Sequence, residues 1–210
     1  MTHDATAQQI QTLPIQFKGQ AWASWVLRIL GWRYRFEGLP TLQGVFIAYP
    51  HTSNWDFVVM MLVKWAAGIR TQFWGKDSLF RIPLFGRWLT WVGGVPINRR
   101  SSSGAVGEMV KVLLQHKREG RYFWLALSPE GTRKHTPGWR SGFYQLALQA
   151  QVPLALIRMD YGQRVIEFAG FVELTGDEAR DYARFADIYA GVLGCKPALA
   201  SPIQALKTNL

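Results

Sequence analysis

The chain has 210 residues, 49% of them hydrophobic, which excludes an intrinsically disordered chain and suffices for one domain with a sizeable core. A single cysteine, Cys195, excludes an intramolecular disulfide framework and suits a reducing compartment. The net charge of +10 is concentrated in residues 70–150, which carry +9. This basic segment implies an anionic partner: a phosphorylated substrate, an anionic lipid surface or a nucleic acid.

Residues 1–32 are expected to form a lead-in followed by a short amphipathic helix that contacts a membrane. Between residues 17 and 32 large apolar side chains recur at helical spacing beside arginines, a pattern typical of an interfacial helix: Trp22, Trp25, Ile29 and Trp32. The alternative is a helix that packs on the core. No segment has the roughly 20 apolar residues of a membrane span, and residues 1–6 lack the basic region of a signal peptide. We therefore expect a cytoplasmic protein, peripheral on the inner face of the membrane.

Strand-like and helix-like segments alternate through residues 33–210, which we expect to form one catalytic domain. The predicted strands are 33–37, 45–49, 71–76, 93–100, 121–127, 152–158 and 164–168. The predicted helices are 57–67, 82–92, 103–120, 141–150 and 177–193. This alternation predicts an α/β fold with a largely parallel central sheet flanked by helices.

Residues 49–57 bring reactive side chains into a predicted strand-to-helix turn. His51 and Asp56 are five residues apart, which on one continuous helix is about 500°, so they would point in different directions. If His51 belongs to the turn and Ser53 or Asn54 caps the helix, Asp56 falls in the first helical turn. The loop can then fold His51 onto the carboxylate, which is a general-base arrangement. The alternative is that Asp56 only complements the helix N-terminus.

Three further predicted strands end in polar turns. They are Lys76-Asp77-Ser78, Asn98-Arg99-Arg100 and Glu130-Gly131-Thr132-Arg133. Sites in such sheets gather beyond the carboxyl ends of the strands, so these turns are expected to meet near His51. There a His–Asp pair can deprotonate an alcohol, while cations and backbone amides stabilise the oxyanion formed when that alcohol attacks an acyl carbonyl. Arg99 and Arg133 can grip a phosphate, and Gly131 permits close backbone approach.

Taken in order, these segments resemble the sequence blocks of the glycerolipid acyltransferase superfamily, whose lysophosphatidic acid acyltransferases make phosphatidic acid. The similar segments are His51-Thr-Ser-Asn-Trp-Asp56, Lys76, Gly93 to Arg99, Glu130-Gly-Thr-Arg133 and Val152-Pro-Leu154. The resemblance covers roughly residues 33–175. One block alone is weak evidence, whereas four in the family's order are specific.

The resemblance implies an O-acyltransferase that moves a fatty acyl group from acyl-CoA or acyl-carrier protein to the hydroxyl of lysophosphatidic acid or a related lysolipid. It makes His51 the general base and Asp56 the residue that orients it, while Lys76 assists the oxyanion. It assigns substrate binding to Asn54, Arg99, Glu130, Gly131, Thr132 and Arg133. The alternatives are surface charge for Arg99 and Arg133, and an ion pair with Arg133 for Glu130.

The implied partners are the lysolipid acceptor, the acyl thioester donor and an anionic membrane surface, without nucleic acid. We expect no cofactor beyond the thioester co-substrate, and no metal site, because the remaining histidines do not cluster as ligands do. Pro96, Ser128 and Leu156 depart from the family's blocks beside the acceptor region, which puts the identity of the acceptor in doubt. A non-enzymatic basic protein that binds anionic membrane or nucleic acid would leave His51 and Asp56 unexplained. A lipid or thioester hydrolase would release fatty acid without an acceptor.

Overall fold

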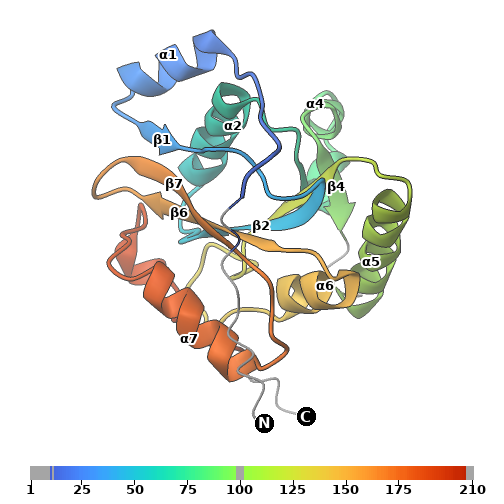
Figure 1. Ribbon diagram of the computed structural model, residues 1–210. Helices are drawn as coiled ribbons and strands as arrows, with labels where there is room; N and C mark the ends of the chain where they lie inside the picture. The colour runs from blue at the N-terminus through green and yellow to red at the C-terminus, as the bar shows by residue number, and fades with distance from the viewer. Residues whose placement is uncertain (1–9, 11, 98–101, 207–210) are drawn as a thin grey trace.

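A seven-stranded sheet lies at the centre of the computed structural model, which describes residues 10, 12–97 and 102–206 (Figure 1). The strands are β1 (Arg33–Arg35), β2 (Gln43–Tyr49), β3 (Gln72–Lys76), β4 (Gly94–Ile97), β5 (Phe123–Leu127), β6 (Leu154–Asp160) and β7 (Val165–Val172). Their order across the sheet is β1-β7-β6-β2-β5-β3-β4. Only β6 and β7 pair antiparallel, and every other described pairing is parallel, so the predicted largely parallel sheet is confirmed.

Helices cover both faces of this sheet (Figure 1). They are α1 (Ala21–Ile29), α2 (Trp55–Ala67), α3 (Asp77–Phe80), α4 (Phe85–Trp91), α5 (Ser102–Arg118), α6 (Gly142–Ala150) and α7 (Glu178–Ile188). Side chains alternate along β2: Val45 and Ile47 join the apolar cluster formed with α5, α6 and α7, whereas Phe46 joins the cluster formed with α1 and α2. The central strand is therefore buried on both faces, as a parallel strand between helical layers should be.

Close packing at the centre of the sheet also fixes the register of β2 against β5. Gly44 pairs with Trp124 of β5, and a Cβ atom at Gly44 would lie 2.3 Å from the indole ring. Only glycine fits there, because the indole of Trp124 is almost completely buried and cannot move aside. This register holds β2 beside β5 and brings the turns that follow them to one edge of the sheet.

The N-terminal helix is shorter than the periodicity predicts. It spans Ala21–Ile29, and Gly31, at φ 75°, turns the chain toward β1. Trp32, which we expected on the exposed stripe, is instead buried and packs edge-on against Tyr161. Within the described ranges, no helix is long and apolar enough to span a bilayer.

The predicted helix over residues 82–92 also begins later than expected. Pro83 has no amide hydrogen and Leu84 has φ 62°, so the helical backbone starts only at Phe85. The short helix α3 precedes it. The predicted strand over residues 93–100 is described only as far as Ile97. The other predicted elements are present, with ends shifted by a few residues.

Candidate active site

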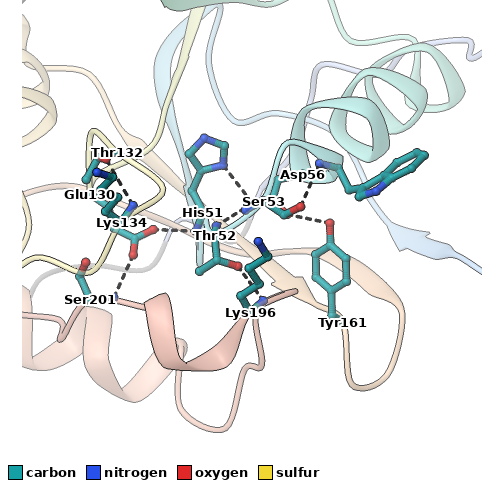
Figure 2. A network of polar contacts seen from close by, with 11 residues as sticks. His51, Thr52, Ser53, Asp56, Glu130, Thr132, Lys134, Tyr161, Lys196 and Ser201 are labelled. Carbon is teal, nitrogen blue, oxygen red and sulfur yellow. Dashed lines mark hydrogen bonds and ion pairs between the residues drawn. The ribbon is translucent and has the colours of Figure 1, made fainter.

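Three neighbouring strands deliver the candidate active site. β2 lies between β6 and β5 and runs parallel to both. It leads through a cis peptide bond at Pro50 to His51, β5 leads to the turn that holds Glu130, and β6 leads directly to Tyr161. Because the carboxyl ends of parallel strands share one edge, these three turns converge in a single polar network (Figure 2).

Asp56 accepts hydrogen bonds on both of its carboxylate oxygens (Figure 2). Oδ2 lies 3.1 Å from Nδ1 of His51 and accepts from the amides of Thr52 at 2.7 Å and Ser53 at 2.8 Å. Oδ1 accepts from the hydroxyl of Tyr161 at 2.6 Å. Asp56 is 1% exposed, so its carboxylate is fixed by protein donors rather than by water.

These hydrogen bonds also determine which partner of the His51–Asp56 pair carries the proton between them. Burial raises the pKa of the Asp56 carboxyl, but hydrogen bonds from His51, Tyr161 and the Ser53 amide outweigh burial and leave the pKa below its ordinary value. Asp56 is therefore ionised at neutral pH and can only accept, so Nδ1 of His51 carries the proton between them. The His51 side chain is 24% exposed, and its other ring nitrogen points away from Asp56 in Figure 2. Nε2 is thus available to take a proton from a bound hydroxyl group.

The start of α2 shows which of the two predicted residues supports the turn. Oγ of Ser53 accepts a hydrogen bond from the amide of Trp55 at 3.2 Å, so Ser53 supplies the side-chain support. Asn54 occupies the N-cap position without a side-chain bond to the helix, and it is exposed. Asp56 lies in the first helical turn, as predicted. The resemblance implies a substrate-binding residue at Asn54, and the exposed side chain leaves that prediction open.

Glu130 supports the backbone of the turn that carries His51. It has no exposed surface; its Oε2 accepts from the amide of His51 at 2.6 Å and its Oε1 from the amide of Ser201 at 2.9 Å. Burial raises the pKa of the Glu130 carboxyl, and the two backbone donors oppose that rise. The resemblance places Glu130 among the substrate-binding residues, and an ion pair with Arg133 was the alternative. In the structure the buried carboxylate accepts from backbone amides on both oxygens, and its assignment to substrate binding stays a prediction.

The other three residues of the Glu-Gly-Thr-Arg turn differ in exposure, because Gly131 and Thr132 are half-buried and Arg133 is exposed. Gly131 has φ 64°, and a Cβ atom there would lie 2.5 Å from Cδ of Arg140, so the arginine stem covers the side on which we expected close approach. Oγ1 of Thr132 accepts from the amide of Lys134 at 3.3 Å. Arg133 is exposed, and its guanidinium can reach an anionic group above the turn.

Lys76 is not brought against the His51–Asp56 pair. Lys76 ends β3 on the same edge of the sheet and is exposed, but β5 separates β3 from β2, a spacing of about 10 Å. Arg99 lies outside the described residues. In the part of the chain that the structure covers, no group of three or more His, Cys, Asp or Glu side chains could hold a metal ion.

Sequence reasoning missed the residues that arrive from the C-terminal part of the chain. Tyr161 binds Asp56 and Ser201 binds Glu130, while the amide of Lys196 donates to Oγ1 of Thr52 at 3.1 Å. Ser201 and Lys196 act through backbone amides, which no sequence motif encodes. Tyr161 lies between the predicted strands 152–158 and 164–168, and only its place in that connection could have suggested a role.

Comparison with known proteins identifies the fold and the family. The acyltransferase family pattern matches residues 33–159. A 1-acyl-sn-glycerol-3-phosphate acyltransferase of Escherichia coli (strain K12) is 31% identical over 117 residues, which are 53% of this chain and only 44% of that curated relative. The crystal structure of the 1-acyl-sn-glycerophosphate (LPA) acyltransferase PlsC from Thermotoga maritima is similar in fold, with a TM-score of 0.51 and 18% identity over 80% of this chain and 73% of that one. Because the family pattern covers more than half of the chain, the protein belongs to the acyltransferase family.

Proposed function

We propose that this protein transfers a fatty acyl group from acyl-CoA or acyl-carrier protein to the hydroxyl of a lysophospholipid. The observation that carries the proposal is the pair of His51 with the ionised carboxylate of Asp56, which leaves Nε2 of His51 at the surface. The relative from Escherichia coli is named for an acylglycerol phosphate, which favours lysophosphatidic acid or a related lysolipid as the acceptor.

The reaction proceeds by direct transfer. Nε2 of His51 takes the acceptor's hydroxyl proton as the hydroxyl oxygen attacks the carbonyl carbon of the thioester. The new C–O bond gives a tetrahedral oxyanion, whose collapse breaks the C–S bond. The thiolate leaves and takes the proton from the imidazolium of His51, which restores the starting state. Asp56 stabilises the imidazolium between these steps, and no covalent enzyme intermediate is required.

Positive charge supports an anionic acceptor. Residues 70–150 carry +9, and the exposed Arg133 lies in the turn beside His51 and Glu130. A forked guanidinium binds phosphate oxygens with two parallel hydrogen bonds, which suits the headgroup of lysophosphatidic acid. In this proposal the exposed Lys76 extends the same positive field along the carboxyl edge of the sheet.

Exposed apolar side chains support attachment to the inner face of an anionic membrane. On α1, Ala23 and Leu27 are buried against the core, while three large side chains are exposed: Trp22, Trp25 and Ile29. Around α4 the exposed apolar residues, here termed the α4 surface, are Leu84, Phe85, Trp88 and Trp91. The sequence from residue 78 to residue 107 has no acidic residue and includes Arg81 and Arg87. Apolar side chains interspersed with arginines match a bilayer with anionic headgroups.

The test is an acyl-transfer assay on purified wild-type and His51→Ala proteins. Lysophosphatidic acid and lysolipids without a phosphomonoester are offered with acyl-CoA and with acyl-carrier protein. We expect wild-type transfer to lysophosphatidic acid, and a roughly 10²- to 10⁴-fold loss in the variant. His116→Ala is the matched control, because His116 lies on α5 and bonds the Val112 carbonyl. Undiminished transfer by folded His51→Ala protein refutes the proposal, and acceptor-independent release of fatty acid identifies a hydrolase instead.

A further inference from the structure

The two oxygens of the Asp56 carboxylate accept different numbers of hydrogen bonds. Three donors converge on Oδ2, namely Nδ1 of His51 and the amides of Thr52 and Ser53. Within the described residues, the hydroxyl of Tyr161 is the donor to Oδ1, at 2.6 Å (Figure 2). Because Asp56 is almost fully buried, loss of this hydroxyl would leave one carboxylate oxygen without a hydrogen bond in a site closed to water.

Tyr161 is itself held rigidly in place. Its amide donates to the carbonyl of Leu193 at 2.8 Å. Its ring packs edge-on against the buried Trp32, with centroids 4.8 Å apart and planes at 87°. A side chain fixed both by a backbone hydrogen bond and by an aromatic contact can hold its hydroxyl in one direction.

We propose that Tyr161 is a positioning residue of the acyl-transfer reaction, whose hydroxyl fixes Oδ1 of Asp56 and thereby keeps Oδ2 in line with Nδ1 of His51. This inference rests on the proposed function. Tyr161 lies two residues beyond the segment that the acyltransferase pattern matches, so the pattern does not account for it. It joins β6 to the catalytic turn of β2, its neighbour in the sheet.

The hydroxyl also controls how strongly Asp56 attracts a proton on His51. By donating to Oδ1, Tyr161 disperses the negative charge that would otherwise stabilise the imidazolium. Two other titratable groups act on this cluster: Glu130, which accepts from the amide of His51, and Cys195, which lies within electrostatic range of Tyr161. Tyr161→Phe leaves both unchanged, so a difference in the titration of His51 reports the hydroxyl alone.

The experiment compares Tyr161→Phe with Tyr34→Phe, whose hydroxyl donates to the carbonyl of Ala66 away from the site. His51 is titrated by NMR on protein labelled with nitrogen-15 histidine, and its signals are assigned with His51→Gln. In Tyr161→Phe we expect the nitrogen-15 titration curve of His51 to differ from that of the wild-type protein, and the acid limb of the kcat/KM profile to move with it. We also expect kcat to fall roughly tenfold, with the KM of both substrates unchanged. Tyr34→Phe should alter none of these quantities.

An unchanged His51 titration and an unchanged kcat in Tyr161→Phe would overturn the inference, as would equal changes in Tyr34→Phe. A uniform loss of rate at every pH with no shift in the His51 titration would show a merely structural role, and would also overturn it. The NMR measurement needs no substrate. If the wild-type protein acylates no lysolipid, the proposed function fails, while the titration still decides whether Tyr161 acts on the His51–Asp56 pair.

Discussion

Two connections that leave the sheet near the site are built in opposite ways. In the turn from β2 into α2, polar side chains are buried and hydrogen-bonded, as with Asp56 at 1% exposure. In the connection from β3 to β4, large apolar side chains face outward, with Leu84 78% and Trp91 77% exposed. Burying polar groups is costly unless each finds a partner, and exposing apolar groups is costly unless another phase covers them. The first connection therefore fixes a geometry, whereas the second presents an apolar surface, which we propose contacts lipid.

The ring of Phe57 connects these two regions. Phe57, the residue after Asp56, lies with its ring 6.2 Å from the ring of Trp88 on α4 and 5.2 Å from that of Phe73 on β3. A lipid bound at the α4 surface would consequently approach α2 at the turn that carries the His51–Asp56 pair. If the turn from β2 into α2 serves acyl transfer and the α4 surface serves membrane binding, substitutions in one region should leave the function of the other unchanged.

The largest expected effect comes from Asp56→Asn. The amide side chain leaves His51 without an ionised partner and turns an NH₂ group toward backbone or side-chain donors, so we expect acyl transfer to fall roughly 10²- to 10⁴-fold. Vesicle binding should stay at the wild-type level, because the α4 surface is untouched. The matched control is Asp181→Asn, since Asp181 is equally buried but lies on α7 and bonds Tyr144 and Thr175. Equal losses in the two variants would mean that Asp56 acts only through stability.

Glu130→Ala should be the most damaging of these changes for stability. It leaves the buried amides of His51 and Ser201 without an acceptor and opens a cavity, at a cost of about 2–4 kcal/mol in the free energy of unfolding. Urea denaturation measures this cost, with the exposed Glu173→Ala as the control. A change below about 1 kcal/mol would contradict the role of Glu130 as a support for the turn.

The α4 surface can be made polar by substitutions that leave the hydrogen bonds around Asp56 unchanged. We expect the double variant Leu84→Ser, Trp91→Ser to weaken binding to anionic vesicles roughly 10- to 100-fold, because each side chain loses about 0.7–1.4 kcal/mol, roughly half the value of full apolar burial. Transfer to a short-chain, water-soluble acceptor should be unaffected.

Trp25→Ser, Ile29→Ser is the matching variant on α1. Substitution tests α1 better than deletion does, because the helix also buries Ala23 and Leu27 in the core. Wild-type vesicle binding by both variants would place the membrane contact elsewhere.

The sequence predicts the fold and the catalytic turn because both depend on local patterns. Alternating strands and helices are sufficient for a largely parallel sheet, and the spacing of His51 and Asp56 across a strand-to-helix turn is sufficient for their contact. The supports depend on contacts between distant parts of the chain. Tyr161 reaches Asp56 across 105 positions, and Ser201 reaches Glu130 across 71. For the same reason the burial of Glu130, which has no exposed surface, could not be predicted from its place in a polar turn.

The smallest predicted effect uses the opposite pKa shifts of the two buried carboxyls. Asp56 has a folded-state pKa below its ordinary 3.8, so the stability it contributes is present above that value and is lost as the pH falls through the folded pKa. Glu130 has a folded-state pKa above its ordinary 4.5, so its contribution is present below that value and is lost as the pH rises through the folded pKa.

The differences in unfolding free energy between wild-type protein and the two isosteric variants should therefore change in opposite directions with pH. Between about pH 3 and about pH 7, we expect the difference for Asp56→Asn to grow and the difference for Glu130→Gln to shrink. Urea titrations at several pH values measure both slopes. Parallel slopes would mean that one electrostatic environment surrounds both carboxyls. Opposite slopes would show that hydrogen bonds dominate at Asp56 and burial at Glu130, which separates the residue that orients the base from the residue that holds its backbone.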